Sequence, residues 1–147
     1  MSCLSWNCRG LGNPQTEAKL ADLVGKKDPK VVFLIETKVD KEIIERISCK
    51  MQYKFFVVVP RHNRGGGLAL LWKEDFAMKV LTSSDNHIDG VVDQQMDDAW
   101  RFMGFYGEPE IASRENSWNL LRDLSHRHNF PWICLGDFNE ILRLKKK

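Results

Sequence analysis

The stretch VVFLIETK, residues 31–38, holds five consecutive apolar residues followed by Glu36, Thr37 and Lys38. An apolar run of this length without polar alternation is typical of a strand that is covered on both faces. A strand of this kind needs packed layers on each side of its sheet, so the stretch favours a layered α/β protein. Glu36 comes directly after the run, where open sheets often present polar groups to a ligand.

The sequence around this run alternates between helical and strand patterns. Asn13 and Pro14 predict the N-cap and first residue of a helix that ends near Gly25, and Asp40 predicts the cap of a short helix. A further helix is expected over 113–128. Strands are expected over 3–8, 31–35, 55–59, 68–72, 77–81, 88–92, 100–106 and 132–135. The order predicts a layered α/β domain with antiparallel strands in its middle.

Composition places the chain among ordinary globular domains. The 147 residues are 43% hydrophobic and 29% charged, with a formal net charge of +2. The four cysteines form no CxxC pair, which favours free thiols in a reducing compartment over a zinc site. No charged-then-apolar leader opens the chain, and no apolar run approaches about 18 residues. We therefore expect an intracellular, nuclear or cytoplasmic protein with no membrane association.

Polar side chains follow four of the predicted strands. Asn7 follows CLSW, Glu36 follows VVFLI, Tyr106 follows WRFMGF, and Asp137 with Asn139 follows WICLG. Carboxylate and amide oxygens suit magnesium, which keeps several waters and takes one or two protein carboxylates. An aspartate at such a site can accept a proton from an attacking water, and a tyrosine can donate to developing negative charge. The set predicts metal-assisted phosphoester hydrolysis.

Each of these residues also has a purely structural interpretation. Asn7 before a Gly-containing segment is compatible with a turn residue, and Glu36 with the solvated end of a strand. Tyr106 is compatible with a strand end whose hydroxyl lies in solvent, and Asp137 and Asn139 with the N-cap of a short helix. The residues alone leave these interpretations open.

Seven segments together resemble the endonuclease/exonuclease/phosphatase superfamily, which has the deoxyribonuclease I-like fold. They are similar above all to the endonuclease domain of plant non-LTR (LINE-type) retrotransposons. The segments, in the family's order, are LSWNCRGLGNPQT, DPKVVFLIETK, GGGLALLWK, HIDGVV, WRFMGFYGEPE, SWNLLRDL and PWICLGDFNEIL. The resemblance implies a four-layered α/β sandwich with two mostly antiparallel sheets face to face and helices outside. It also implies metal-dependent cleavage of a phosphodiester, with Mg²⁺ (or Mn²⁺) as cofactor and DNA as substrate.

The resemblance assigns roles to the same strand-end residues. It implies that Glu36 and Asn7 are the metal-site residues and that Tyr106 faces the phosphate. Asp137 then activates the water, and Asn139 orients water and phosphate.

The resemblance also covers rather more than half of the family domain. Family members continue past GDFN with a second metal-proximal aspartate and a late Ser-Asp-His motif, whereas residues 1–147 end soon after it. We therefore expect a partial domain, truncated on its C-terminal side, with impaired activity as an isolated chain. We also expect a bare inner sheet face, with Val57, Leu68, Leu70 and Phe102 as candidates, and self-association through exposed sheet edges.

Basic residues are unevenly distributed along the chain. Arg61 and Arg64 lie beside three glycines at 65–67, and Arg9 lies in the first Gly-rich turn. These three arginines are candidates for weak nucleic-acid binding. Two alternatives to a nuclease remain at this point: a non-catalytic remnant that binds metal or nucleic acid weakly, and a phosphatase-type member acting on small phosphoesters.

Overall fold

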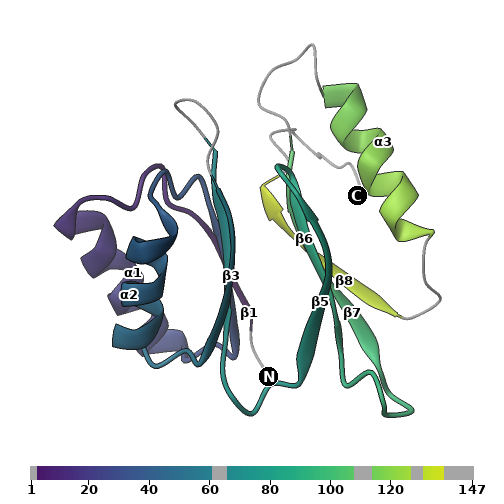
Figure 1. The fold of residues 1–147 in the computed structure, drawn as a ribbon, viewed down its shortest axis with the longest axis horizontal. Helices are drawn as coiled ribbons and strands as arrows, with labels where there is room; N and C mark the ends of the chain where they lie inside the picture. The colour runs from purple at the N-terminus through teal and green to yellow at the C-terminus, as the bar shows by residue number, and fades with distance from the viewer. Residues whose placement is uncertain (1–2, 61–65, 108–113, 127–130, 138–147) are drawn as a thin grey trace, which may run out of the picture.

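The computed structural model describes residues 3–60, 66–107, 114–126 and 131–137. Within these residues, two four-stranded sheets face each other. Helices α1 and α2 cover the outer side of the first sheet, and helix α3 lies outside the second (Figure 1). The layers are therefore helix, sheet, sheet and helix, as the resemblance implied.

The first sheet is formed by the N-terminal half of the chain in the strand order β1-β2-β4-β3. Strands β1 and β2 are parallel, whereas β4 is antiparallel to both of its neighbours. All five residues of β2 are buried, as its uninterrupted apolar run predicts. The strands are β1 (Cys3–Asn7), β2 (Val31–Ile35), β3 (Phe55–Val59) and β4 (Leu68–Trp72).

The second sheet follows in the order β5-β6-β7-β8. Strands β5, β6 and β7 form an antiparallel meander, and β8 pairs in parallel with β7. Both sheets are therefore mixed, each with one parallel pair, and β8 lies close to β1 and β2 of the first sheet. The strands are β5 (Met78–Ser84), β6 (His87–Val92), β7 (Trp100–Tyr106) and β8 (Trp132–Asp137).

The helices start where capping chemistry predicts. Helix α1 (Pro14–Lys27) begins after Asn13, whose side chain accepts a hydrogen bond of 2.8 Å from the Thr16 amide. It continues two residues past Gly25 and ends where Asp28 adopts the left-handed conformation. Helix α2 (Lys41–Lys50) follows Asp40, and helix α3 (Arg114–Ser125) connects β7 to β8. No helix within the described ranges is long and apolar enough to cross a membrane.

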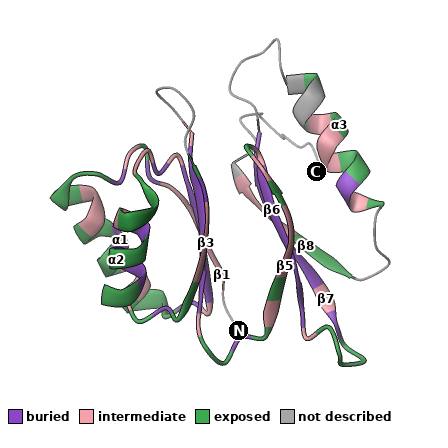
Figure 2. Ribbon diagram, viewed as in Figure 1, coloured by how far each residue is buried: buried purple, intermediate pink, exposed green. Residues whose placement is uncertain are grey.

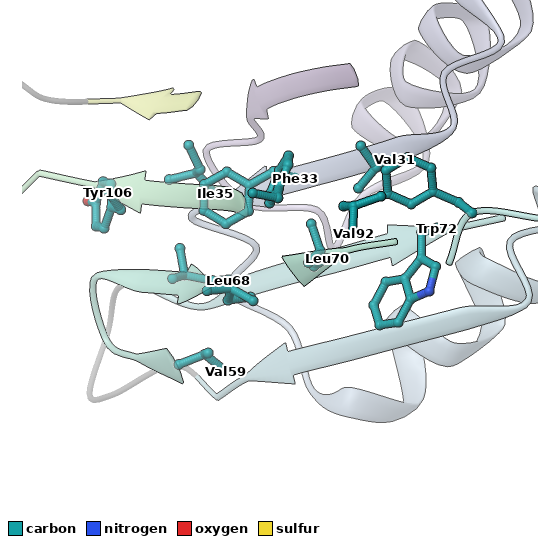
Figure 3. Close-up of a cluster of buried hydrophobic side chains, with 12 residues drawn as sticks. Val31, Phe33, Ile35, Val59, Leu68, Leu70, Trp72, Val92 and Tyr106 are labelled. Atoms are coloured by element: carbon teal, nitrogen blue, oxygen red, sulfur yellow. The ribbon is translucent and has the colours of Figure 1, made fainter. Parts of the chain in front are cut away.

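The main core lies between the two sheets. Phe33 of β2 is fully buried there, together with Leu68 and Leu70 of β4 (Figures 2 and 3). Phe102 of β7 is fully buried in the same cluster. The expectation of a bare inner sheet face is therefore wrong for Leu68 and Leu70, because β5 to β8 cover them, whereas Val57 in β3 stays partly exposed. Phe102 also belongs to the second sheet rather than to the first.

A close contact between glycine and an aromatic ring sets the spacing of the sheets at one point. A Cβ atom added to Gly104 of β7 would lie 2.6 Å from a ring carbon of Phe33. Only glycine lets the ring of Phe33 approach the backbone of β7 this closely, since packed carbon atoms normally stay about 3.5–4.0 Å apart. Gly104 lies two residues before Tyr106, so this contact also helps to set the position of the end of β7.

Candidate active site

The parallel pairing of β1 with β2 brings Asn7 next to Glu36. Asn7 is in register with Ile35, the last residue of β2. Beyond the strands the pairing continues, because the Gly10 amide donates to the Glu36 carbonyl oxygen at 2.8 Å. The Asn7 carboxamide oxygen accepts a hydrogen bond of 3.0 Å from the Arg9 amide. Asn7 is therefore the last residue of β1, and its side chain also stabilises the turn that follows.

Glu36 occupies an unusual backbone conformation. Its φ is +54°, in the left-handed region that costs non-glycine residues roughly 1–3 kcal/mol. Two backbone hydrogen bonds hold the next residue, Thr37, in place. The Leu11 amide donates to the Thr37 carbonyl oxygen, and the Thr37 amide donates to the Gly67 carbonyl oxygen. Strain that is kept by surrounding hydrogen bonds in this way is frequent at functional sites.

Tyr106 joins the ends of the two sheets. Its phenolic hydroxyl donates a hydrogen bond of 2.7 Å to the Glu36 carboxylate, although the two residues are 70 positions apart. Tyr106 is only 7% exposed, and Figure 3 places it beside Ile35 at one end of the core, with Trp72 at the other. Two of the structural interpretations are therefore wrong: Glu36 is not merely a solvated strand end, and the Tyr106 hydroxyl does not simply face solvent.

Asp137 lies beside Tyr106 at the same end of the second sheet. Its backbone pairs with Tyr106 in the parallel ladder between β7 and β8. Gly136, directly before it, has a φ of +147°, and a Cβ there would lie 1.7 Å from the Phe105 carbonyl oxygen. Only glycine permits this approach, which brings the β8 backbone to the end of β7.

The remaining candidate groups are only partly described. The side chain of Asp137 and all of Asn139, Arg61 and Arg64 lie outside the described residues. Arg9 is described, and it is exposed in the turn after β1 with a φ of +51°. The structure thus brings together Asn7, Glu36, Tyr106 and the backbone of Asp137.

Cysteine chemistry does not contribute to this site. Burial raises the pKa of the Cys8 thiol to about 12, and the nearby Glu36 charge adds to this effect. A thiol with such a pKa stays protonated at neutral pH and is neither a good nucleophile nor a good metal ligand. The four cysteines are free, as expected from their spacing.

The donor set of the site suits a hard cation. Glu36 provides a carboxylate whose Oε2 accepts the Tyr106 hydrogen bond, and Asn7 provides a carboxamide oxygen. Within the described ranges there is no cluster of three or more His, Cys, Asp or Glu side chains that would form a protein cage for a metal. One carboxylate with oxygen neighbours fits Mg²⁺, which relies on water and substrate phosphate for its other ligands.

Residues 4–144 match the model of the endonuclease/exonuclease/phosphatase family. The chain belongs to this family. Family members typically use a divalent metal, in agreement with the donor set. No curated protein matches the sequence of the chain.

Solved structures show the same fold at low sequence identity. The catalytic domain of human Nocturnin with bound sulfate is 12% identical, with a TM-score of 0.67 over 92% of this chain and 62% of its own. An AP endonuclease from Archaeoglobus fulgidus is 16% identical, with a TM-score of 0.67 over 92% and 56%. The 3′ phosphatase NExo from Neisseria, bound to product DNA hairpin, is 18% identical, with a TM-score of 0.63 over 92% and 57%. The chain thus spans a little over half the length of these family structures.

Two residues near the site were not singled out from the sequence. Thr37 is fully buried, and its hydroxyl has no hydrogen-bond partner among the described residues. Asn86, which the sequence marks only as part of a turn, forms two hydrogen bonds with the backbone of Tyr106. A polar residue directly after Glu36 is a signal that could have pointed to Thr37, whereas Asn86 carries no comparable signal.

Proposed function

We propose that this chain is part of a magnesium-dependent DNA endonuclease domain of retroelement origin. The observation that carries the proposal is the hydrogen bond between Tyr106 and Glu36, because it gathers the ends of β2 and β7 beside Asn7 and Asp137. The retroelement origin rests on the seven segments of sequence resemblance. DNA as substrate is supported by the family structures described as an AP endonuclease and as bound to a DNA hairpin.

In the proposed reaction, water attacks the phosphorus atom and the bond to the leaving sugar oxygen breaks. Asp137 accepts the proton of the attacking water, and Asn139 orients the water and a phosphate oxygen. Glu36 and Asn7 hold the metal, which when bound stabilises the negative charge that develops on the phosphate. Tyr106 fixes the Glu36 carboxylate and faces the phosphate group.

We further propose that residues 1–147 alone turn over slowly. The resemblance assigns a phosphate-contacting histidine and a second aspartate to segments that come after GDFN. Loss of one such electrostatic donor commonly lowers kcat about 100- to 1000-fold. A non-catalytic remnant that binds metal or nucleic acid weakly is the alternative to this proposal.

Nicking of supercoiled plasmid in the presence of Mg²⁺ tests the assignment. Glu36→Ala and Asp137→Ala should each abolish nicking, whereas Glu45→Ala, which removes an exposed carboxylate from α2, should leave it unchanged. Nicking that survives both site substitutions would indicate a contaminating nuclease and contradict the proposal. A chain extended by the later segment of a family member should nick about 100-fold faster or more. No nicking even by the extended chain would favour the remnant.

A phosphatase acting on small phosphoesters is the second candidate, and a structure of the same fold that is described as a mannosyl-6-phosphatase from Bacteroides thetaiotaomicron favours it. The two functions differ in product. An endonuclease converts supercoiled plasmid to open circles, whereas a phosphatase releases inorganic phosphate from a small phosphoester and leaves the plasmid intact.

Weak DNA binding through Arg9 is tested by salt. The affinity should fall as salt rises, because phosphate contacts release counterions, and Arg9→Ala should reduce this salt dependence by about one counterion. An affinity independent of salt would contradict the assignment of Arg9.

A further inference from the structure

The turn between β5 and β6 reaches the end of β7. Asn86 in this turn accepts a hydrogen bond of 2.7 Å from the Tyr106 amide through its backbone carbonyl. Its side-chain amide donates a second bond of 2.9 Å to the Tyr106 carbonyl oxygen. The last ladder pair of β6 and β7 is His87 with Phe105, so Asn86 extends the pairing by one more residue.

The two hydrogen bonds between Asn86 and Tyr106 act on the residue that joins the two sheets. On one side the backbone of Tyr106 contacts Asn86, and on the other it is in register with Asp137 of β8. The phenol at the end of the same residue donates to Glu36. A displacement of the Tyr106 backbone therefore changes both its hydrogen bond to Glu36 and its ladder with Asp137.

Asn86 is itself anchored by a series of half-buried hydrogen bonds. Its amide donates to the Ser84 hydroxyl oxygen at 3.1 Å, and that hydroxyl lies 2.6 Å from Nδ1 of His87. The other ring nitrogen of His87 lies 2.8 Å from the Thr82 hydroxyl, which donates in turn to Asp89 at 3.2 Å. Ser84, His87, Thr82 and Asp89 thus form one continuous series of polar side-chain contacts.

The far end of this chain is an ion pair within the sheet. Asp89 of β6 and Arg101 of β7 meet at 2.7 Å with both side chains 1% exposed, and a second bond between them measures 3.2 Å. Two bonds between buried partners fix both groups more firmly than a surface pair does. The residues that anchor Asn86 thus lie in β5, β6 and β7, and β7 is the strand that ends at Tyr106.

We propose that Asn86 is a positioning residue that holds Tyr106 in place for its contact with Glu36. The proposal rests on the proposed function in so far as this contact serves phosphodiester hydrolysis. Asn86 itself acts only through Tyr106.

A fluorine NMR experiment tests the positioning without any measurement of activity. The chain has two tyrosines, so protein labelled with 3-fluorotyrosine gives two resonances, which a Tyr53→Phe variant assigns. Tyr53 donates to the Pro29 carbonyl on the far side of the first sheet and is an internal reference for folding. Asn86→Ala should shift the Tyr106 resonance and leave that of Tyr53 in place.

Two further variants sharpen this test. Asn86→Asp keeps the size of the side chain but replaces the donor with an acceptor, so it should shift the Tyr106 resonance as well. Ser83→Ala removes an exposed hydroxyl from β5, the strand before the turn that holds Asn86, and should shift neither resonance. An unshifted Tyr106 resonance in folded Asn86→Ala and Asn86→Asp would overturn the proposal.

The nicking assay supplies the functional readout. Asn86→Ala should lower kcat about threefold to tenfold, the effect of one lost hydrogen bond, with little change in KM. In a Tyr106→Phe background the same substitution should lower kcat less than about twofold, because the bond to Glu36 is already gone. A full effect in that background would assign Asn86 a general structural role and overturn the proposal. If no variant nicks DNA, the proposed function fails, while the fluorine spectra still decide the role of Asn86.

Discussion

Replacing Gly104 by alanine should separate the two sheets at the point where they pack most closely. The added methyl group would lie 2.6 Å from one ring carbon of Phe33 and 2.7 and 2.8 Å from two others. Normal carbon contacts need about 3.5–4.0 Å, so ring and backbone must move apart by about 1 Å. Phe33 is fully buried in β2 and has little room to turn away.

The expected cost follows from overpacking. Extra methyl groups in a well-packed core typically cost about 1–3 kcal/mol, and this contact belongs at the upper end because backbone and a buried ring oppose each other. For a chain of this size, 2–3 kcal/mol corresponds to a fall in Tm of roughly 4–12 °C. Urea unfolding followed by circular dichroism measures the free energy directly.

The matched control is the same substitution at a site with space. Gly25 lies in helix α1, and a Cβ there meets nothing within 4 Å. Gly25→Ala should therefore raise the free energy of unfolding by about 0.5–1 kcal/mol. Phe33→Leu combined with Gly104→Ala should recover part of the loss, since the smaller side chain relieves the contact. Gly104→Ala with unchanged stability, or a double variant without recovery, would refute this account of the sheet spacing.

Three other predictions concern buried charge and thiols. Asp89→Ala should lower the free energy of unfolding by about 3–5 kcal/mol, because it leaves the Arg101 charge buried without its partner. Replacing both Asp89 and Arg101 with apolar residues should cost less stability. Equal losses in the single and double variants would contradict this reasoning. Burial raises the pKa of Cys8 from 9.0 to about 12, so the unfolded chain loses the proton first and stability should fall between these pH values. By pH 10 the loss due to Cys8 is about 1.4 kcal/mol. Cys8→Ala should reduce the total loss by this amount but not abolish it, because burial also raises the pKa of Cys134 to about 12. Urea unfolding at pH 7 and 10 measures the difference between the two proteins. At pH 8 a thiol reagent should modify exposed Cys49 fastest, half-buried Cys134 more slowly, and buried Cys8 only after urea is added. Equally rapid modification of all three would contradict the pKa values of about 12 for Cys8 and Cys134.

Much of the fold is predictable because its signals are local. The apolar run at 31–35 predicts a strand buried on both faces, and Asn13 with Pro14 predicts the start of α1. The end of β8 was predicted two residues too early, because Gly136 weakens the strand pattern that its pairing with Phe105 sustains. The cover over the first sheet was missed for another reason, since the opposing layer was expected from segments after GDFN, whereas β5 to β8 supply it.

The candidate site also has features that local sequence predicts and features that it does not. Glu36 and Tyr106 were found because each carries a polar group at the end of an apolar run: Glu36 follows β2, and Tyr106 is the last residue of β7. Their hydrogen bond spans 70 positions and appears only when the two sheets pack together. Asn86 was missed because its sequence context indicates a turn, whereas its contacts with Tyr106 depend on the length of two neighbouring strands.

The order of the strands has a consequence for synthesis on the ribosome. The first sheet is complete at Trp72, and the strands that cover its inner face are made only afterwards, up to Asp137. At about 5–20 residues per second, the interval between these two residues lasts roughly 3–13 seconds. During this time the inner-facing side chains of β2 and β4, including Phe33 and Leu70, have no covering layer. A chaperone that binds nascent apolar surface should therefore contact this chain mainly while the segment from Trp72 to Asp137 is being synthesised.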